Sequence, residues 1–314
     1  MTKLLSISVI IPLYNKQDAI TRTIQSVLDQ TVSDFELVVV DDGSTDNSLA
    51  VVQAIDDRRI RVIHKENGGV SSTHNVGIKA AKGQYVALLD GDDLWEPTFL
   101  EEQMRLVADF PEAGMWGVNY AFVKGDRCWA CQQGMGKGFR GYVENYFGTR
   151  HNDLYCSSSV VIRKDVFETA GYFDERISAS EDLDMWYRII LHYPVVYYDK
   201  VLAYYNQNAE NRVAYDTDYR FPLTKSIKYY VDKYQSDFQS NPDFSRFLNN
   251  YVAANLLKEG YYFGSKQERR DSDRVVKSLR YQDIHSKYRW IFKTPRWFGK
   301  IVYKVVCLKK RIKH

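Results

Sequence analysis

Four short apolar segments alternate with helical patterns over the first ninety residues, and this alternation limits the fold more than any other feature. The segments span residues 7–12, 35–40, 60–64 and 84–89, and they are rich in β-branched and aromatic residues. Such runs are typical of strands that are covered on both faces. Strands that alternate with helices connect through right-handed crossovers. The sequence therefore predicts an α/β fold, with a mostly parallel sheet and helices on both of its faces.

The later part of the chain is expected to extend this sheet and then to add helices. Further strands are predicted at 115–123 and 157–163, and further helices after Pro97 and Ser180. Residues 124–148 are rich in Gly and aromatic residues without a period, which predicts a long loop. Helical periodicity returns at 221–234 and 244–263. We therefore expect two domains, residues 1–212 and a helical extension over residues 213–314.

Acidic residues follow two of the predicted strands at their carboxyl ends. Asp41 and Asp42 follow the second strand, and the sequence Asp-Gly-Asp-Asp at residues 90–93 follows the fourth. Because the carboxyl ends of parallel strands meet at one edge, these acids are expected to lie close together. Hard divalent cations prefer such oxygen ligands, so residues 90–93 indicate a metal site. A solvated acidic turn is the alternative interpretation of that stretch.

The same edge of the predicted sheet suits a nucleotide. Tyr14 follows the first strand, where its ring could stack on a base while Asp41 or Asp42 accepts from base or ribose. No Gly-x-Gly-x-x-Gly or Walker sequence follows that strand, which argues against dehydrogenases and phosphate-loop enzymes. Glu181 and Asp182 begin a predicted helix, where the helix dipole favours acids whether or not they act in catalysis.

The C-terminal stretch differs in charge from the rest of the chain. Residues 285–314 contain seven Lys and three Arg and no acid, although the whole chain carries only +3. From residue 288 on, Trp and Phe alternate with these cations, which is typical of an amphipathic helix at an anionic membrane surface. A helix that closes the core is the alternative. Binding of nucleic acid is not expected, because no nucleic-acid module accompanies the tail.

Cysteine usage and hydropathy indicate a location in the cell. Cys128 and Cys131 have the spacing of a zinc or redox motif but lack a second pair. The four cysteines form no disulfide framework, which fits a reducing compartment. No apolar run reaches the length of a membrane span, and residues 1–5 lack the features of a signal peptide. We therefore expect a cytoplasmic protein, bound peripherally to the inner face of the cell membrane through residues 288–314.

An ordered set of motifs resembles the family 2 glycosyltransferases, which have the GT-A fold with a Rossmann-like sheet. The matching stretches are SVIIPLYN (8–15), VVDDGSTD (39–46), NGG (67–69), NVG (75–77), LDGDD (89–93), GYFD (171–174) and Glu181-Asp182 ahead of WYR (186–188). They extend over about residues 6–205 in the order and spacing of the family. A single short motif is weak evidence, whereas the ordered set is specific.

The resemblance implies a role for each matching residue. It places the nucleotide-sugar at Pro12, Tyr14, Asp41, Asp42, Asn67, Asn75, Asp90 and Gly91. It identifies Asp90 and Asp92 as the DxD motif, with Asp92 as the main ligand of Mn²⁺ or Mg²⁺. It assigns the catalytic base to Asp182, with Glu181 beside it.

These roles form a consistent reaction. A cation stabilises the leaving diphosphate, and a carboxylate takes the proton of an acceptor hydroxyl. One direct displacement then inverts the anomeric centre. The resemblance therefore implies an inverting hexosyl- or N-acetylhexosaminyltransferase of polysaccharide or lipid-linked glycan synthesis. Its donor is expected to be UDP-linked, and its acceptor a saccharide or lipid-linked glycan.

The sequence also departs from the family pattern. Many relatives carry Arg and His after the strand that ends near Tyr204, whereas here Asn208 and Arg212 are the candidates to replace that His. One alternative is a sugar nucleotidylyltransferase, but residues 13–16 lack its Gly-rich triphosphate loop. An inactive, membrane-associated protein that binds nucleotide-sugars is the other alternative.

Overall fold

The computed structural model describes residues 7–132, 134–148, 154–177, 180–208, 233–234, 240–255 and 270. The chain divides into two compact units, of which the first comprises Met1–Tyr146 and His151–Tyr215. The second comprises Phe147–Arg150 and Asp216–His314. Both acidic clusters lie in the first unit.

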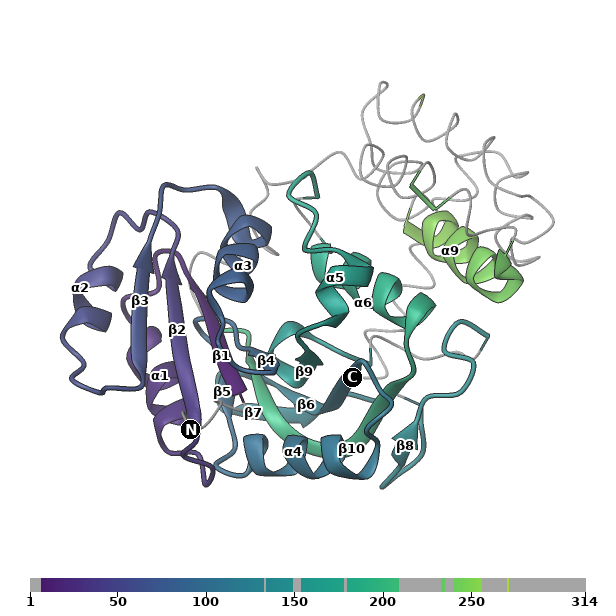
Figure 1. Ribbon diagram of the computed structural model, residues 1–314, viewed down its shortest axis with the longest axis horizontal. Helices are drawn as coiled ribbons and strands as arrows, with labels where there is room; N and C mark the ends of the chain where they lie inside the picture. Colours follow the sequence, from purple (N-terminus) through teal and green to yellow (C-terminus); the bar gives the residue numbers. More distant parts are fainter. Residues whose placement is uncertain are drawn as a thin grey trace. The chain divides into compact units, whose positions relative to one another are not determined.

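The first unit is built on a ten-stranded mixed sheet (Figure 1). Its strands are β1 (Ile7–Leu13), β2 (Phe35–Asp41), β3 (Ile60–His64), β4 (Tyr85–Leu88), β5 (Leu94–Trp95), β6 (Met115–Lys124), β7 (Arg127–Ala130), β8 (Arg140–Tyr142), β9 (Val160–Arg163) and β10 (Val195–Asn206). Their order is β3-β2-β1-β4-β9-β6-β10-β5, with β7 beside β6 and β8 beside β10.

The strand directions bring the acidic clusters to one edge of the sheet. Strand β1 pairs in parallel with both β2 and β4, with Leu13 opposite Asp41 and Ile10 opposite Leu88. Strand β9 is antiparallel to both β4 and β6, and β10 is parallel to β6. The carboxyl ends of β1, β2, β4, β6 and β10 therefore share an edge. The predicted α/β sheet is confirmed.

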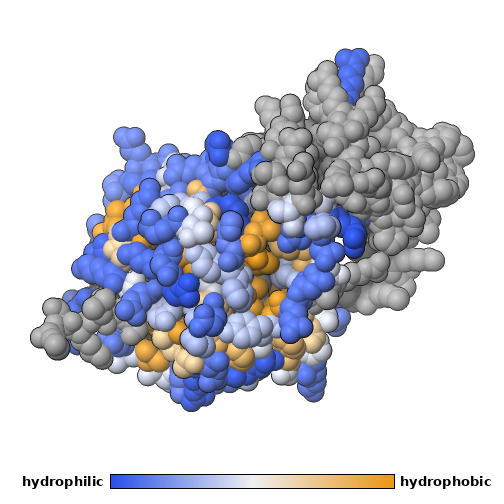
Figure 2. All heavy atoms as spheres, turned by 45° about the vertical axis from the view of Figure 1, so that its right-hand side comes forward, coloured by the Kyte–Doolittle hydropathy of each residue, from blue (hydrophilic) through white to orange (hydrophobic). Residues whose placement is uncertain are grey.

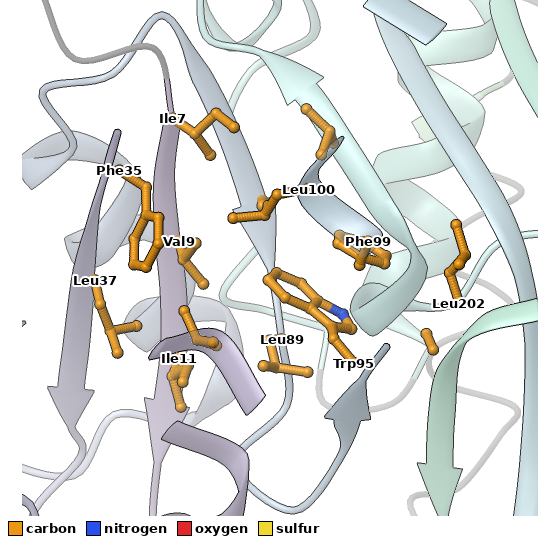
Figure 3. Packing of buried hydrophobic residues seen from close by; sticks show 14 of the residues in the cluster. Ile7, Val9, Ile11, Phe35, Leu37, Leu89, Trp95, Phe99, Leu100 and Leu202 are labelled. Carbon is orange, nitrogen blue, oxygen red and sulfur yellow. The ribbon is translucent and has the colours of Figure 1, made fainter. Parts of the chain in front are cut away.

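Helices cover both faces of this sheet (Figure 1). They are α1 (Ile20–Leu28), α2 (Ser48–Gln53), α3 (Gly69–Ala80), α4 (Phe99–Asp109), α5 (Val166–Ala170) and α6 (Glu181–His192). Figure 3 shows Ile7, Val9 and Ile11 of β1 on the face that also holds Phe99 and Leu100 of α4. Helix α3 packs on the opposite face of β1 and on β2. The side chains of β1 alternate between these two faces because successive strand residues point to opposite sides.

Two local predictions need correction. Residues 124–148, predicted as a loop, contain β7 and β8. The sequence of β7, Arg-Cys-Trp-Ala, does not alternate between apolar and polar residues, so no period of two marked this strand. The strand predicted at 157–163 begins only at Val160, after a 3₁₀ turn over Ser157–Ser159. The hydroxyl of Ser159 accepts from the N–H of Cys156 at 3.0 Å, and such local side-chain bonds compete with strand pairing.

In the second unit the structure describes helix α9 (Pro242–Asn255). The ring of Phe147 lies 4.7 Å from that of Phe244 and 5.4 Å from that of Phe247. Most of the helix predicted at 221–234, the end of the one predicted at 244–263, and the tail 288–314 lie outside the described residues. Among the helices that are described, none is long and apolar enough to cross a membrane.

Hydrophilic residues predominate among the described residues on the face that Figure 2 shows. The large apolar residues that stay exposed in the described ranges are Tyr14, Trp129 and Tyr142. Scattered exposed aromatics need no special explanation. Tyr14 differs from the other two because it directly follows β1, at the edge that holds the acids.

The contact between α3 and the sheet yields a prediction. A Cβ added to Gly77 would clash with Cγ2 of Ile10 and would lie 3.3 Å from Cγ2 of Val40. We expect Gly77→Val to lower the free energy of unfolding by about 1–3 kcal/mol, the usual cost of overpacking. Urea unfolding measures the change. Lys79→Val, at an exposed position of the same helix, is the control, and equal stability of the two variants would contradict the prediction.

Candidate active site

Asp42 organises the loop that leads into helix α3. Its carboxylate accepts from the N–H groups of Gly68 and Gly69, both at 2.9 Å, and pairs with the ammonium of Lys65. The amide of Asn67 donates to the carbonyl of Asp42 at 3.0 Å. The carboxylate therefore holds residues 65–69 against the end of β2. Asp42 and Asn67, both predicted at the nucleotide, shape this wall of the site together.

Asp41 is buried and fixes the ends of two strands. One of its carboxylate oxygens lies 2.7 Å from Nδ1 of His64, and the other accepts from the N–H of Ser44 at 3.4 Å. The imidazole of His64 itself is largely exposed at the end of β3. The sequence analysis did not single out His64 or Lys65. Their only signal in the sequence is that they follow the third predicted strand, as the acids follow the second.

The loop after β1 is locked to the loop after β2. The side-chain oxygen of Asn15 accepts from the N–H of Thr45 at 2.8 Å, and the N–H of Asn15 donates to the hydroxyl of Ser44 at 3.1 Å. The ring of Tyr14 is 44% exposed beside this junction. Tyr14 therefore stands on a rigid support with its ring open to a ligand.

Gly91 allows the acidic loop, residues 90–93, to approach β1. A Cβ at Gly91 would lie 2.9 Å from the carbonyl oxygen of Pro12, a distance that real Cβ contacts essentially never show. The carbonyl of Gly91 accepts from the hydroxyl of Thr23 at 3.2 Å. Pro12 and Gly91, both predicted at the nucleotide-sugar, thus form the junction between β1 and residues 90–93.

Asp93 anchors the acidic loop through its buried carboxylate. Its carboxylate is 1% exposed and accepts from the hydroxyl of Ser158 at 2.5 Å and from the N–H of Asn206 at 2.9 Å. Burial, followed by the charges of Asp90 and Asp92, raises the pKa of Asp93 well above its ordinary value. The hydroxyl of Ser158 also accepts from the N–H of Asp90 at 3.1 Å. Asp93 is therefore part of the frame that carries Asp90 and Asp92.

Asp92 is paired with a lysine that the sequence analysis missed. Its carboxylate lies 2.7 Å from the ammonium of Lys16, and both side chains are mostly buried. Asp92 also borders a cavity of about 260 Å³ that Arg22, Tyr204 and Asn208 help to line. The side-chain oxygen of Asn208 accepts from the N–H of Gly125 at 2.6 Å. The other candidate for the missing family histidine, Arg212, lies outside the described residues.

Glu181 and Asp182 begin helix α6 beside the acidic loop. Burial, then the negative charges of Asp182 and Asp90, raise the pKa of Glu181 to about 8. The charges of Asp93, Asp90 and Asp182 likewise contribute to raising the pKa of the Cys156 thiol, after the larger effect of its burial. Glu181 and Cys156 therefore both lie within electrostatic range of Asp90 and Asp182. That these carboxylates act together in metal binding and catalysis stays a prediction.

Asn75 links helix α3 to a later segment of the chain. Its amide nitrogen donates to the carbonyl of Phe173 and to the carboxylate of Glu175, both at 2.9 Å. Its oxygen accepts from the N–H of Phe173 at 2.9 Å. Asn75 therefore joins α3 to residues 173–175 as a buried structural link. The expected contact of Asn75 with the nucleotide-sugar stays a prediction.

Asp90 and Asp92 fit a cation that is shared with a ligand. Within the described ranges, no three or more His, Cys, Asp or Glu residues lie together as a complete metal site. Mg²⁺ and similar ions are often held by one or two carboxylates, with substrate phosphates as the other ligands. The ammonium that already lies on Asp92 shows that this carboxylate attracts a cation. The donor set therefore suits a metal that binds together with a diphosphate.

The raised pKa of Glu181 yields a prediction about pH. Between its ordinary value of 4.5 and about 8, Glu181 is protonated in the folded protein and ionised in the unfolded chain. Its contribution to stability is therefore complete below pH 4.5 and is lost as the pH rises toward 8. We expect Glu181→Gln, which cannot ionise, to gain stability relative to the wild type as the pH rises from 5 to 8.5. Urea unfolding at several pH values measures the difference.

The control for this pH dependence is an exposed acid. Glu112→Gln changes the same chemical group at the protein surface, so its difference from the wild type should vary little with pH. Parallel pH profiles for wild type and Glu181→Gln would contradict the prediction.

Known glycosyltransferases are similar to parts of this chain in sequence. It is 49% identical over 89 residues to the uncharacterized glycosyltransferase EpsJ of Bacillus subtilis, covering 28% of this chain and 26% of the relative. It is 36% identical over 123 residues to glycosyltransferase GlyG of Streptococcus pneumoniae, covering 38% of this chain and 41% of the relative. The chain thus spans well under half the length of these curated relatives.

The comparison of structures extends over more of the chain. The crystal structure of S. aureus TarS 1-349 in complex with UDP-GlcNAc matches with a TM-score of 0.74 at 19% identity, covering 94% of this chain and 88% of that chain. At this identity the match supports the GT-A fold alone. The model of the family described as glycosyl transferase family 2 matches residues 8–171, more than half of the chain. The chain therefore belongs to glycosyl transferase family 2.

Proposed function

We propose that the protein is an inverting glycosyltransferase that moves a sugar from a UDP-linked donor to a hydroxyl group of a saccharide or lipid-linked glycan. One observation carries the proposal: carboxylates follow two parallel strands, β2 and β4, that flank β1 at one edge of the sheet. Asp41 and Asp42 lie at the end of β2, and Asp90 and Asp92 follow β4. The charge of Asp90 also acts on Glu181 at the start of α6. We assign these groups to the nucleoside, the diphosphate and the transferred sugar, in that order.

The residues proposed to bind the nucleoside form a surface rather than a single contact. The exposed ring of Tyr14 can stack on a base, and residues 65–69, held by Asp42, form the adjacent wall. The carboxylate of Asp42 already accepts three donors, so its first task is to hold this wall. TarS, which has a similar fold, was crystallised with UDP-GlcNAc. That complex supports a UDP-sugar as the class of donor.

Asp90 and Asp92 are the residues that would hold Mn²⁺ or Mg²⁺. Such a cation supplies Lewis-acid stabilisation of the negative charge on a leaving diphosphate. The protein contributes by fixing the loop: Ser158 and the N–H of Asn206 hold Asp93, and Thr23 holds Gly91. Positioning of this kind matters because small displacements of ligands weaken both binding and rate.

Asp182 is the proposed general base. It would take the proton of the acceptor hydroxyl while that oxygen attacks the anomeric carbon and the bond to the diphosphate breaks. Glu181, with a pKa of about 8, is the protonated member of the pair near neutral pH. A protonated Glu181 cannot accept a proton near neutral pH, so we assign the base to Asp182 beside it.

The alternative activities are less well supported. A sugar nucleotidylyltransferase needs a flexible Gly-rich loop near the first strand, whereas residues 13–16 are tied to the loop after β2. A protein that only binds nucleotide-sugars would not need an acidic helix start facing the metal site. A measurement of sugar transfer decides whether the protein is a glycosyltransferase or only binds nucleotide-sugars.

Asp182→Asn tests the proposed chemistry. We expect the variant to lose about 10²- to 10⁴-fold in transfer rate, the usual contribution of a general base. Its binding of UDP and UDP-sugars should be unchanged, because the residue is proposed to act on the acceptor. Transfer is measured with UDP-, GDP- and dTDP-sugars, with and without Mn²⁺. Binding is measured by thermal shift, since a ligand of the folded state raises its stability.

Glu181→Gln is the matched control for this experiment. Near neutral pH it resembles the protonated state of Glu181, so it should keep most of the transfer activity. Full turnover by Asp182→Asn would disprove the assignment of the base. Binding of UDP-sugars without any turnover by the wild type, across acceptors, would instead favour the inactive sugar-nucleotide-binding protein.

Membrane association through residues 288–314 is a further part of the proposal, supported by composition alone, since these residues lie outside the described ranges. Deleting them should abolish co-sedimentation with anionic liposomes and leave the protein in solution. A variant with Lys309, Lys310 and Arg311 changed to Glu should bind more weakly, and neutral liposomes should bind less than anionic ones. Unchanged sedimentation after the deletion would contradict this location at a membrane surface.

A further inference from the structure

Lys16 occupies the carboxylate that the proposed cation would use. Its ammonium lies 2.7 Å from Oδ2 of Asp92, and the two side chains are 15% and 12% exposed. An ion pair that is largely withdrawn from water is screened less by salt than one at the surface. The pair therefore competes with any other cation that approaches Asp92.

The backbone of Lys16 is fixed, so only its side chain can move. Its N–H donates to the hydroxyl of Ser48 at 2.7 Å, and its carbonyl accepts from the N–H groups of Ala19 and Ile20 at 3.0 and 2.9 Å. The stem of Lys16 passes over Gly91, with Cγ 3.7 Å from the position that a Cβ of Gly91 would take. A long, flexible stem on a rigid base allows the ammonium to leave Asp92 without refolding of the loop.

The surroundings of Asp92 have room for a hydrated ion. Asp92 lines a cavity of about 260 Å³ together with Arg22, Tyr204 and Asn206. A cation that keeps several waters, as Mg²⁺ does, needs such space next to its protein ligands. An incoming ion can therefore approach Asp92 through this cavity.

We infer that Lys16 is a built-in competitor for the divalent cation: its ammonium holds Asp92 in the cation-free protein and is displaced when cation and diphosphate bind. The inference rests on the proposed function, because that function supplies the cation and the diphosphate. A divalent ion displaces the ammonium when it contacts Asp92 and the diphosphate together, because it carries twice the charge and gains several anionic ligands at once. Lys16 then sets how tightly the cation binds before the donor arrives.

The exchange links cation binding to donor binding. Without a donor, the ion must replace the ammonium at Asp92 with few other anionic ligands in reach. With a donor, the diphosphate adds ligands for the ion and an anionic partner for the released ammonium of Lys16. Two ligands that favour the same arrangement strengthen each other's binding by an equal factor. UDP should therefore tighten the binding of Mn²⁺ in the wild type.

A titration of Mn²⁺ followed by electron paramagnetic resonance tests the inference without relying on turnover. We expect Lys16→Met to lower the Kd of Mn²⁺ by about five- to tenfold, since it removes a partly buried competitor. The gain that UDP gives to Mn²⁺ affinity should shrink in the same variant. Lys16→Arg keeps a cation on Asp92 and should stay within about twofold of the wild type.

Arg22→Met is the matched control for general charge. It removes one positive charge from the wall of the same cavity but leaves the ion pair of Lys16 with Asp92 intact. Its Kd for Mn²⁺ should change by less than about twofold if competition, rather than overall potential, determines the affinity. An equal effect of Arg22→Met and Lys16→Met would overturn the inference.

A second measurement follows the ammonium itself. Acylation of Lys16 by a succinimidyl ester, quantified by mass spectrometry, should rise when saturating Mn²⁺ is added without UDP, because Asp92 no longer holds the amine and no diphosphate is present to pair with it. An unchanged Kd in Lys16→Met, or no binding of Mn²⁺ by either protein, disproves the competition. These results are independent of turnover, so they leave the proposed glycosyl transfer to be judged by its own assay.

Discussion

The crowding of carboxylates at one sheet edge is the constraint on which the rest of this structure depends. Several acids lie there together, and like charges in a poorly hydrated place repel strongly unless each is neutralised. The structure accommodates them in different ways: a contact with His64 for Asp41, Lys65 and two N–H groups for Asp42, Lys16 for Asp92, burial with hydrogen bonds from Ser158 and an N–H for Asp93, and a retained proton for Glu181. Some of these acids are therefore held by backbone groups that stay in place, whereas others are paired with a side chain that can be exchanged.

That difference separates the acids that support loops from Asp92, the proposed metal ligand. The carboxylates of Asp42 and Asp93 accept hydrogen bonds from backbone N–H groups, and both residues are buried. Asp92 is paired with a flexible side chain next to a cavity, so its partner can be exchanged. A carboxylate that is neutralised by a mobile group can change partner during a reaction. One that is neutralised by the backbone cannot, because the loop would have to move.

The sequence predicts features that depend on local pattern and misses those that depend on distant pairs. Apolar runs gave the strands, and the acids after them gave the edge, because both signals lie within a few neighbouring residues. The role of Lys16 was not predicted because its partner, Asp92, is 76 residues away along the chain. Strand β7 was not predicted because its four residues are exposed and do not alternate between apolar and polar types. The hydrogen bonds of Asn75 to Phe173 were not predicted, because the family motif indicates which residue recurs and not which contacts its amide makes.

The reversed strand β9 explains how the edge obtains its neutral donors. A parallel strand delivers its carboxyl end to this edge, whereas β9 runs antiparallel to β4 and β6 and delivers its beginning. The 3₁₀ turn that precedes β9 therefore lies at residues 90–93, where Ser158 donates to Asp93 and accepts from the N–H of Asp90. The indole of Trp95 donates to the carbonyl of Ser158 at 2.6 Å and holds the turn in place. The mixed sheet is thus the feature that allows Asp93 to be buried and Asp92 to remain available.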